Sequence, residues 1–189
     1  MGDSPLEELE AHEHAEHAQH AAHGNNPLVS QVTLTIAVMA VIAAVGASLE
    51  TTEGDRTIIS KNEAVLEQNR ATDKWNEYQA QSLKEKMYAI AGDQMPARAA
   101  DYGAKSKGYA TAKIKLMAEA KGLEEKRDGF SEEAEVHERR HGRLTIASTL
   151  LHMAIAIATL AIILNKRWPW LTALGLTAVG LGLAAWAYL

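Results

Sequence analysis

Residues 137–141 read His-Glu-Arg-Arg-His, which matches the H-E-x-x-H pattern of zinc proteases. In such enzymes the two histidines bind Zn²⁺ from one face of a helix, and the glutamate activates a water molecule. Both intervening residues here are arginines, whose charge opposes a nearby metal dication. No third ligand follows at a suitable distance, and the segment borders an apolar stretch. We therefore predict no catalytic residues and keep a membrane metalloprotease as a minor alternative.

The first 27 residues form a polar tail without lysine or arginine. A serine–proline start and an alanine-rich composition predict a helix in it. Its histidines are His12, His14, His17, His20 and His23. Together they could bind a divalent metal ion weakly or become charged near about pH 6. The alternative is a solvated tail without a fixed task. Because the chain has no cysteine, we expect no high-affinity metal site and no cofactor.

One further histidine, His152, lies inside an apolar stretch. An ionisable side chain in such a place is a candidate proton carrier or haem ligand. The other interpretation is a neutral imidazole that hydrogen-bonds a neighbouring helix, with Thr149 or a backbone carbonyl as partner. No second ligand accompanies His152, so the sequence favours the structural role.

Three uncharged stretches predict three membrane-spanning helices, at residues 29–49, about 144–164 and about 170–189. About 20 residues with a rise of about 1.5 Å each cross the hydrocarbon layer. Small residues on the first span allow close helix packing: Ala40, Ala43, Ala44 and Ala47. Tryptophan and tyrosine mark the ends of the third span. Residues 165–169 are too few for more than a tight turn, so the second and third spans should form a hairpin.

The predicted fold is an all-α membrane protein. Four prolines and a high alanine content argue against β-sheet. We divide the chain into a tail at 1–27, a transmembrane helix at 28–50, an extramembrane arm at 51–143 and a transmembrane hairpin at 144–189. Within the arm we expect helices at about 55–91, 97–128 and 131–143. Glycine and proline at 92–96, and Gly129, mark the breaks.

Two seven-residue repeats run along the arm. Asn62, Asn69 and Asn76 are in phase, and Leu83 and Ile90 continue their row. Polar residues in such a row indicate a coiled-coil seam that sets register or oligomeric state. The second repeat contains Tyr102, Tyr109, Leu116 and Leu123. We expect it to pack against the first arm helix, so that the arm is an antiparallel helical hairpin.

One flank of the first arm helix carries Trp75, Tyr78, Gln79, Ser82 and Lys84. We expect Trp75 and Tyr78 to pack on the returning tyrosines, with Gln79 and Ser82 hydrogen-bonding across the helices. The alternative is a surface for a partner protein.

The stretch Trp-Asn-Glu-Tyr-Gln-Ala-Gln-Ser-Leu-Lys at 75–84 resembles a W-x-x-Y-Q-A-x-S-x-K motif of the bacterial family called domain of unknown function 4337. An acidic tail with histidines, a charged helical middle that ends near a histidine like His141, and a basic-tryptophan turn like that at 166–168 extend the resemblance over most of the chain. It implies a bacterial inner-membrane protein without assigned activity, and it supplies no catalytic residues. The Arg139–Arg140 pair and the full H-E-x-x-H match depart from the family pattern.

Our leading hypothesis is a non-enzymatic bacterial inner-membrane protein that self-associates and acts as a scaffold or accessory subunit. Its partners would be the lipid bilayer, further copies of itself and another membrane protein. The net charge of −5 offers no basic face for nucleic acid. The alternative hypothesis is a metal- or pH-responsive sensor that uses the tail histidines.

Basic residues near the spans predict the orientation. The arm carries Arg56 and Lys61 near the first span and three arginines at 139–143 near the second, which favours a cytoplasmic arm. Lys166 and Arg167 in the short turn argue for the opposite orientation, and long segments such as the arm obey the rule less well. We favour the cytoplasmic arm.

Overall fold

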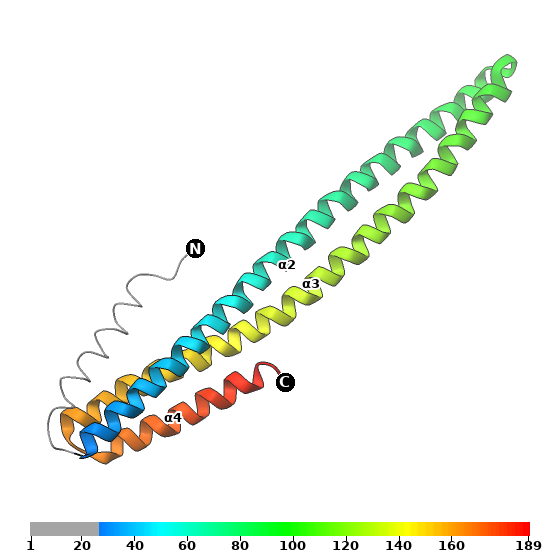
Figure 1. The fold of residues 1–189 in the computed structure, drawn as a ribbon. Coiled ribbons are helices and arrows are strands. Elements are labelled where there is room, and N and C mark those ends of the chain that lie inside the picture. Colours follow the sequence, from blue (N-terminus) through cyan, green and yellow to red (C-terminus); the bar gives the residue numbers. More distant parts are fainter. Residues whose placement is uncertain (1–26) are drawn as a thin grey trace. The chain divides into compact units, whose positions relative to one another are not determined.

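The computed structural model describes residues 27–189, and every regular element in that part of the chain is helical (Figure 1). The elements are α2 over Pro27–Gln94, the short 3-10 helix η1 over Pro96–Arg98, α3 over Ala99–Leu164 and α4 over Arg167–Trp186. The all-α prediction is confirmed for these residues. The tail histidines, His12, His14, His17, His20 and His23, lie outside the described residues.

Three of these helices are long and apolar enough to cross a membrane. This agrees with the three predicted spans. α2 carries its apolar stretch at its amino-terminal end, and α3 carries its own at the carboxyl-terminal end. The chain therefore has three helices able to cross a membrane, with a long polar segment between its first two apolar stretches.

Two helices are longer than the sequence predicts. The expected break at 92–96 is confirmed, because α2 ends at Gln94 and Pro96 starts η1. The expected break at Gly129 is wrong, because α3 continues through it without interruption into the apolar stretch. One glycine inside a helix costs about 1 kcal/mol relative to alanine. The packed turns on either side of Gly129 offset that cost.

Contacts along the chain define two compact units. The first contains, among the described residues, 27–55 and 137–189, and the second contains 56–136. α2 and α3 each contribute to both units, whereas α4 belongs to the first.

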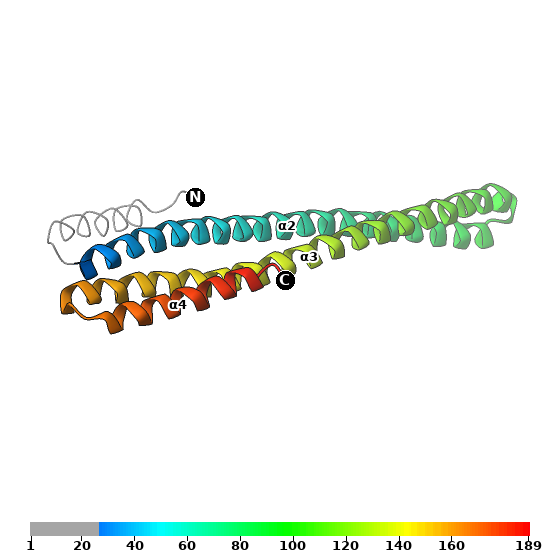
Figure 2. The same cartoon turned by 60° about the horizontal axis from the view of Figure 1, so that its bottom comes forward.

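The core of the first unit comes from the apolar stretches of its three helices, which lie side by side (Figure 2). Its buried members are Val32, Ile36, Met39, Ala154, Ala158, Ala161 and Ala173. Within this cluster the buried residues of α3 and α4 are all alanines, and such small side chains let helices approach closely in lipid. Of the small residues predicted to pack on the first span, Ala43 is buried, Ala40 and Ala47 are half-buried, and Ala44 is exposed.

The connection between α3 and α4 is shorter than the predicted turn at 165–169. Asn165 adopts a left-handed conformation with φ of 49°, which asparagine tolerates better than most residues. α4 already begins at Arg167, so Trp168 and Pro169 lie in its first turn. A proline is accepted there because the first turn of a helix does not use its N–H groups.

In the second unit α2 and α3 pack against each other in opposite directions. Glu85 pairs with Lys113, and Lys74 pairs with Glu119, so lower residue numbers on one helix meet higher numbers on the other. The buried residues of α2 there are alternately three and four positions apart, so they lie on one face of the helix. They are small or polar: Thr57, Ser60, Ala64, Glu67 and Ala71. Ala120 and Ala134 are buried on α3. The two helices meet through these small side chains.

Candidate functional site

A buried glutamate–histidine pair lies in the first unit, where the apolar stretches of α2 and α3 meet polar sequence. Glu53 exposes 2% of its surface and His137 exposes 8%. Oε2 of Glu53 lies 2.5 Å from Nδ1 of His137. An ionised carboxylate only accepts hydrogen bonds, so Nδ1 of His137 carries the proton that it donates. The pairing matters because a carboxylate without such a partner is costly to remove from water.

Further contacts connect this pair and the nearby arginines of α3 to the residues at the end of α4. The hydroxyl of Tyr188 lies 3.4 Å from Oε1 of Glu53. The guanidinium of Arg140 lies over the Tyr188 ring, 5.3 Å from its centroid. Arg143 donates a hydrogen bond of 2.9 Å to the carbonyl of Trp186 and stacks on that indole at 4.3 Å. Two arginines of α3 thus hold the last residues of the chain against the first unit.

A second set of contacts lies one helical turn away. Nδ1 of His141 lies 3.0 Å from the backbone carbonyl of Glu50, and a carbonyl can only accept, so this nitrogen is protonated. Thr145 donates to Oε1 of Glu50 at 2.7 Å. Gly54 makes room for the imidazole, because an added Cβ would lie 3.3 Å from two atoms of the His141 ring. We call Glu50, Glu53, His137, His141, Thr145 and Tyr188 the boundary cluster.

The boundary cluster explains the H-E-x-x-H match differently from a zinc site. His137 and His141 lie on α3, but each uses Nδ1 to bind a different residue of α2. Glu138, the would-be catalytic base, is exposed. No group of three or more His, Cys, Asp or Glu side chains among residues 27–189 is arranged to hold a metal ion. What the cluster can do is keep a buried carboxylate hydrogen-bonded and fasten α2 to α3 through two sets of hydrogen bonds.

The predicted interaction residues of the arm are only partly brought together. Trp75 contacts the edge of Tyr78, with ring centroids 5.5 Å apart, and its indole N–H donates to Glu124 at 2.8 Å. Glu124, rather than the returning tyrosines, is therefore the hydrogen-bond partner of Trp75. Gln79 is exposed, and Ser82 is half-buried.

The ring of Tyr88 on α2 contacts both tyrosines of the second seven-residue repeat, Tyr102 and Tyr109. Its ring stacks on Tyr109 with centroids 5.5 Å apart, and it lies 5.9 Å from Tyr102. Lys84 lies 5.7 Å from the centroid of Tyr109. Sequence reasoning missed Tyr88, although it falls on the same seven-residue spacing as the buried residues Ser60 and Glu67.

Asn62, Asn69 and Asn76 are all exposed, and they lie on a different face of α2 from the residues that contact α3. Their row is therefore not part of the packing between α2 and α3 in the second unit. A seam between these asparagines and another chain stays a prediction.

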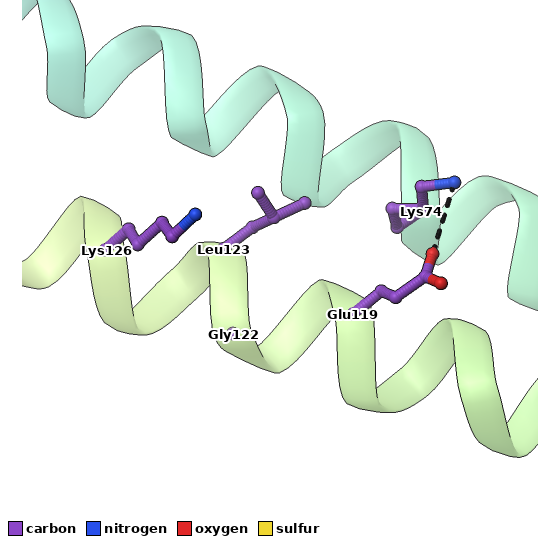
Figure 3. A pocket seen from close by; sticks show the side chains of 5 residues that line it. All are labelled: Lys74, Glu119, Gly122, Leu123 and Lys126. Carbon is purple, nitrogen blue, oxygen red and sulfur yellow. Dashed lines mark ion pairs between the residues drawn. The ribbon is translucent and has the colours of Figure 1, made fainter.

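A shallow, open hollow on the second unit is lined by Lys74, Glu119, Gly122, Leu123 and Lys126 (Figure 3). Lys74 lies 3.3 Å from Glu119 across it. Hydrogen bonds to Glu77 and Glu119 raise the pKa of Lys74 above its usual value. Its charge is thus already neutralised within the unit, and the hollow offers no enclosed binding site.

The comparisons with known proteins gave one match. The model of the family described as Domain of unknown function (DUF4337) matches residues 28–189. No curated protein and no solved structure matches the chain.

Proposed function

We propose that this chain, which belongs to the DUF4337 family, is a non-enzymatic membrane protein that self-associates and serves as a scaffold or accessory subunit of a membrane complex. In this proposal it crosses the bacterial inner membrane three times, and the second and third spans form a hairpin. The segment between the first two spans is a coiled-coil-like helical hairpin in the cytoplasm.

The observation that supports the proposal is an exposed apolar face on the polar part of α2. Ile58, Ile59 and Val65 expose 59%, 59% and 60% of their surface, and Leu66 exposes 42%. Farther along the same helix Leu83, Met87 and Ile90 expose 61%, 60% and 56%. We call these seven residues, together with Asn62, Asn69 and Asn76, the outer row.

The outer row is unusual because it lies outside the apolar stretches. Isoleucine and leucine inside a membrane span face lipid at no cost, but in water each gains about 1.5–3 kcal/mol when it becomes fully buried. The seam with α3 instead uses alanine, serine and threonine. The seven apolar side chains of the outer row are thus left available for a second helix.

The asparagines favour a second copy of this chain as that helix. Copies inserted in one membrane share their orientation, so two α2 helices related by a two-fold axis would run parallel and in register. Each asparagine would then meet its own counterpart, as buried asparagines do in parallel coiled-coil dimers, where they fix the register. Ile58 and Val65, one turn from Asn62, would add apolar contact on either side.

The test is the native mass of the full protein extracted in mild detergent. We expect a defined homo-oligomer for the unmodified chain. Replacing Ile58, Val65 and Leu66 together by serine should shift it toward smaller species. Ile114→Ser is the matched control, because Ile114 is equally exposed, at 61%, but lies on α3 away from the outer row. It should leave the mass unchanged.

Two other outcomes are informative. A strictly monomeric protein at all concentrations would contradict self-association. A stoichiometric complex with a different membrane protein would make the chain an accessory subunit, and loss of that complex in the outer-row variant would identify the row as its docking surface.

A further inference from the structure

His152 is the only ionisable residue within the apolar stretches at 29–49, 144–164 and 170–186. It lies roughly 12 Å inside the α3 stretch when measured from Leu144, at a rise of about 1.5 Å per residue. The side chain is exposed on the first unit. Among residues 27–189, none makes a hydrogen bond or an ion pair with it. Thr149, the partner that the sequence suggests, donates to the carbonyl of Thr145 at 2.8 Å instead.

This position is unfavourable if lipid covers it. Ionisable side chains within spans almost always face protein or a water-filled cavity, because hydrocarbon offers no hydrogen-bond partner. The exposed face of α2 in its apolar stretch shows what a lipid-facing surface looks like in this protein. There, large branched residues are exposed, including Leu34, Val38, Val41 and Val45.

The face of α3 around His152 carries small residues directly beside the histidine, although Met153 and Leu160 are also exposed on this helix. Thr149 precedes His152 by three positions and Ala156 follows it by four, so all three lie on one side of the helix and all are exposed. Small residues on both sides of a polar one are typical of helix–helix contacts in membranes, since they let the partner backbone approach the polar group.

We propose that the face of α3 formed by Thr149, His152 and Ala156 is an intramembrane interface with the same face of a second copy of this chain. The inference rests on the self-association proposed above and names a contact within the bilayer. Two copies inserted in the same direction place His152 at the same depth. An imidazole in its neutral form has one N–H donor and one nitrogen acceptor, so one His152 can donate its N–H to the unprotonated nitrogen of the other, which forms one hydrogen bond between the two copies. A second copy therefore supplies the missing partner without a further component.

Disulfide crosslinking in native membranes tests the interface directly, because the chain contains no cysteine. Thr149→Cys and Ala156→Cys should each form an oxidised dimer, since a disulfide requires Cβ atoms within about 4.5 Å of each other. The control is Val179→Cys on α4. This valine is exposed and lies well inside its apolar stretch, and its variant should stay uncrosslinked.

A second measurement separates hydrogen bonding from packing. His152→Leu should weaken self-association in detergent about three- to tenfold, which is the range that one interhelical hydrogen bond provides in membranes. His152→Gln keeps a donor and an acceptor and should retain most of the affinity. Equal affinity for the unmodified chain and the leucine variant would overturn the role of His152.

The two proposals fail in different ways. An oligomer by native mass that gives no dimer at Thr149→Cys or Ala156→Cys would refute this interface but leave self-association intact. Crosslinks at these cysteines to a different protein would refute the second copy as occupant. A monomer in every measurement would refute both proposals.

Discussion

At the scale of single residues, Glu53 shows how strongly this protein depends on particular pairs. With 2% of its surface exposed, its carboxylate has almost no contact with water. His137 lies 2.5 Å from one carboxylate oxygen and the Tyr188 hydroxyl lies 3.4 Å from the other. Removing one member of a buried hydrogen-bonded pair is more damaging than replacing both, because the remaining polar group loses the contact that offset its burial.

We therefore expect His137→Ala to lower the free energy of unfolding by about 3 kcal/mol, the lower end of the cost of breaking a buried pair. The double variant with Glu53→Gln should be more stable than His137→Ala alone, because the amide leaves no buried charge. Thermal unfolding in detergent, followed by helical circular dichroism, measures both. Glu63→Gln, at an exposed position of α2, is the control. Glu53→Gln alone completes the comparison, and simple addition of the two single effects would contradict the explanation by pairing.

The Glu53–His137 pair shows which of its two residues the sequence could single out and which it could not. Sequence reasoning set aside a zinc site at the H-E-x-x-H match, and in the structure the two histidines bind α2 through Nδ1. Glu53 itself was not predicted. It lies 84 residues from His137, and no local spacing connects two residues that meet only because long helices run in opposite directions.

At the scale of elements, close helix approach in the first unit depends on glycine and alanine. Gly180 of α4 faces α3, and a Cβ at this position would lie 3.2 Å from the Ala147 carbonyl oxygen and 3.3 Å from Cγ of Leu151. The carbonyl belongs to the helix backbone and cannot move aside alone. Gly182 has no such neighbour within 4 Å. An added side chain would therefore clash at Gly180 but find open space at Gly182.

Gly180→Ala should separate α4 from α3 and destabilise the protein, by about 1–3 kcal/mol as for other overpacked cores. Gly182→Ala should be neutral or slightly stabilising, because alanine has the higher helix propensity. Retention of the folded state during heating in detergent compares the two variants. Equal stability of both would show that α4 does not pack as closely on α3 as the structure indicates.

Seven-residue spacing predicted one arm helix better than the other. On α3 the spacing that includes Tyr102 and Tyr109 does lie against α2 through Tyr88. On α2 the most apolar row, with Ile58 and Val65, lies away from α3, and small residues such as Ala64 form the contact. Periodicity identifies the faces of a helix. It does not show which of these faces packs against another helix of the same chain, because small residues can also form a close contact.

At the scale of the whole molecule, the basic residues that flank the apolar stretches favour one membrane orientation of the proposed three-span protein. The basic residues flanking the spans on that segment are Arg56, Lys61, Arg139, Arg140 and Arg143. On the opposite side the basic residues are Lys166 and Arg167 of the short turn, and the tail at 1–27 adds no lysine or arginine to them. Positive charge close to a span favours the cytoplasm. Arg139, Arg140 and Arg143 lie at most five residues from the start of the α3 stretch, well within the distance over which such charges influence orientation.

We predict from this balance that a cysteine at Lys107 reacts with a membrane-impermeant maleimide only after the inner membrane has been permeabilised. A cysteine at Asn165, in the turn between α3 and α4, should react in cells whose inner membrane is intact. The cysteine-free chain provides the unlabelled background. The reverse pattern would mean that Lys166 and Arg167 determine the orientation. It would place the outer row of α2 outside the cytoplasm, and any partner of that row would then have to be sought there.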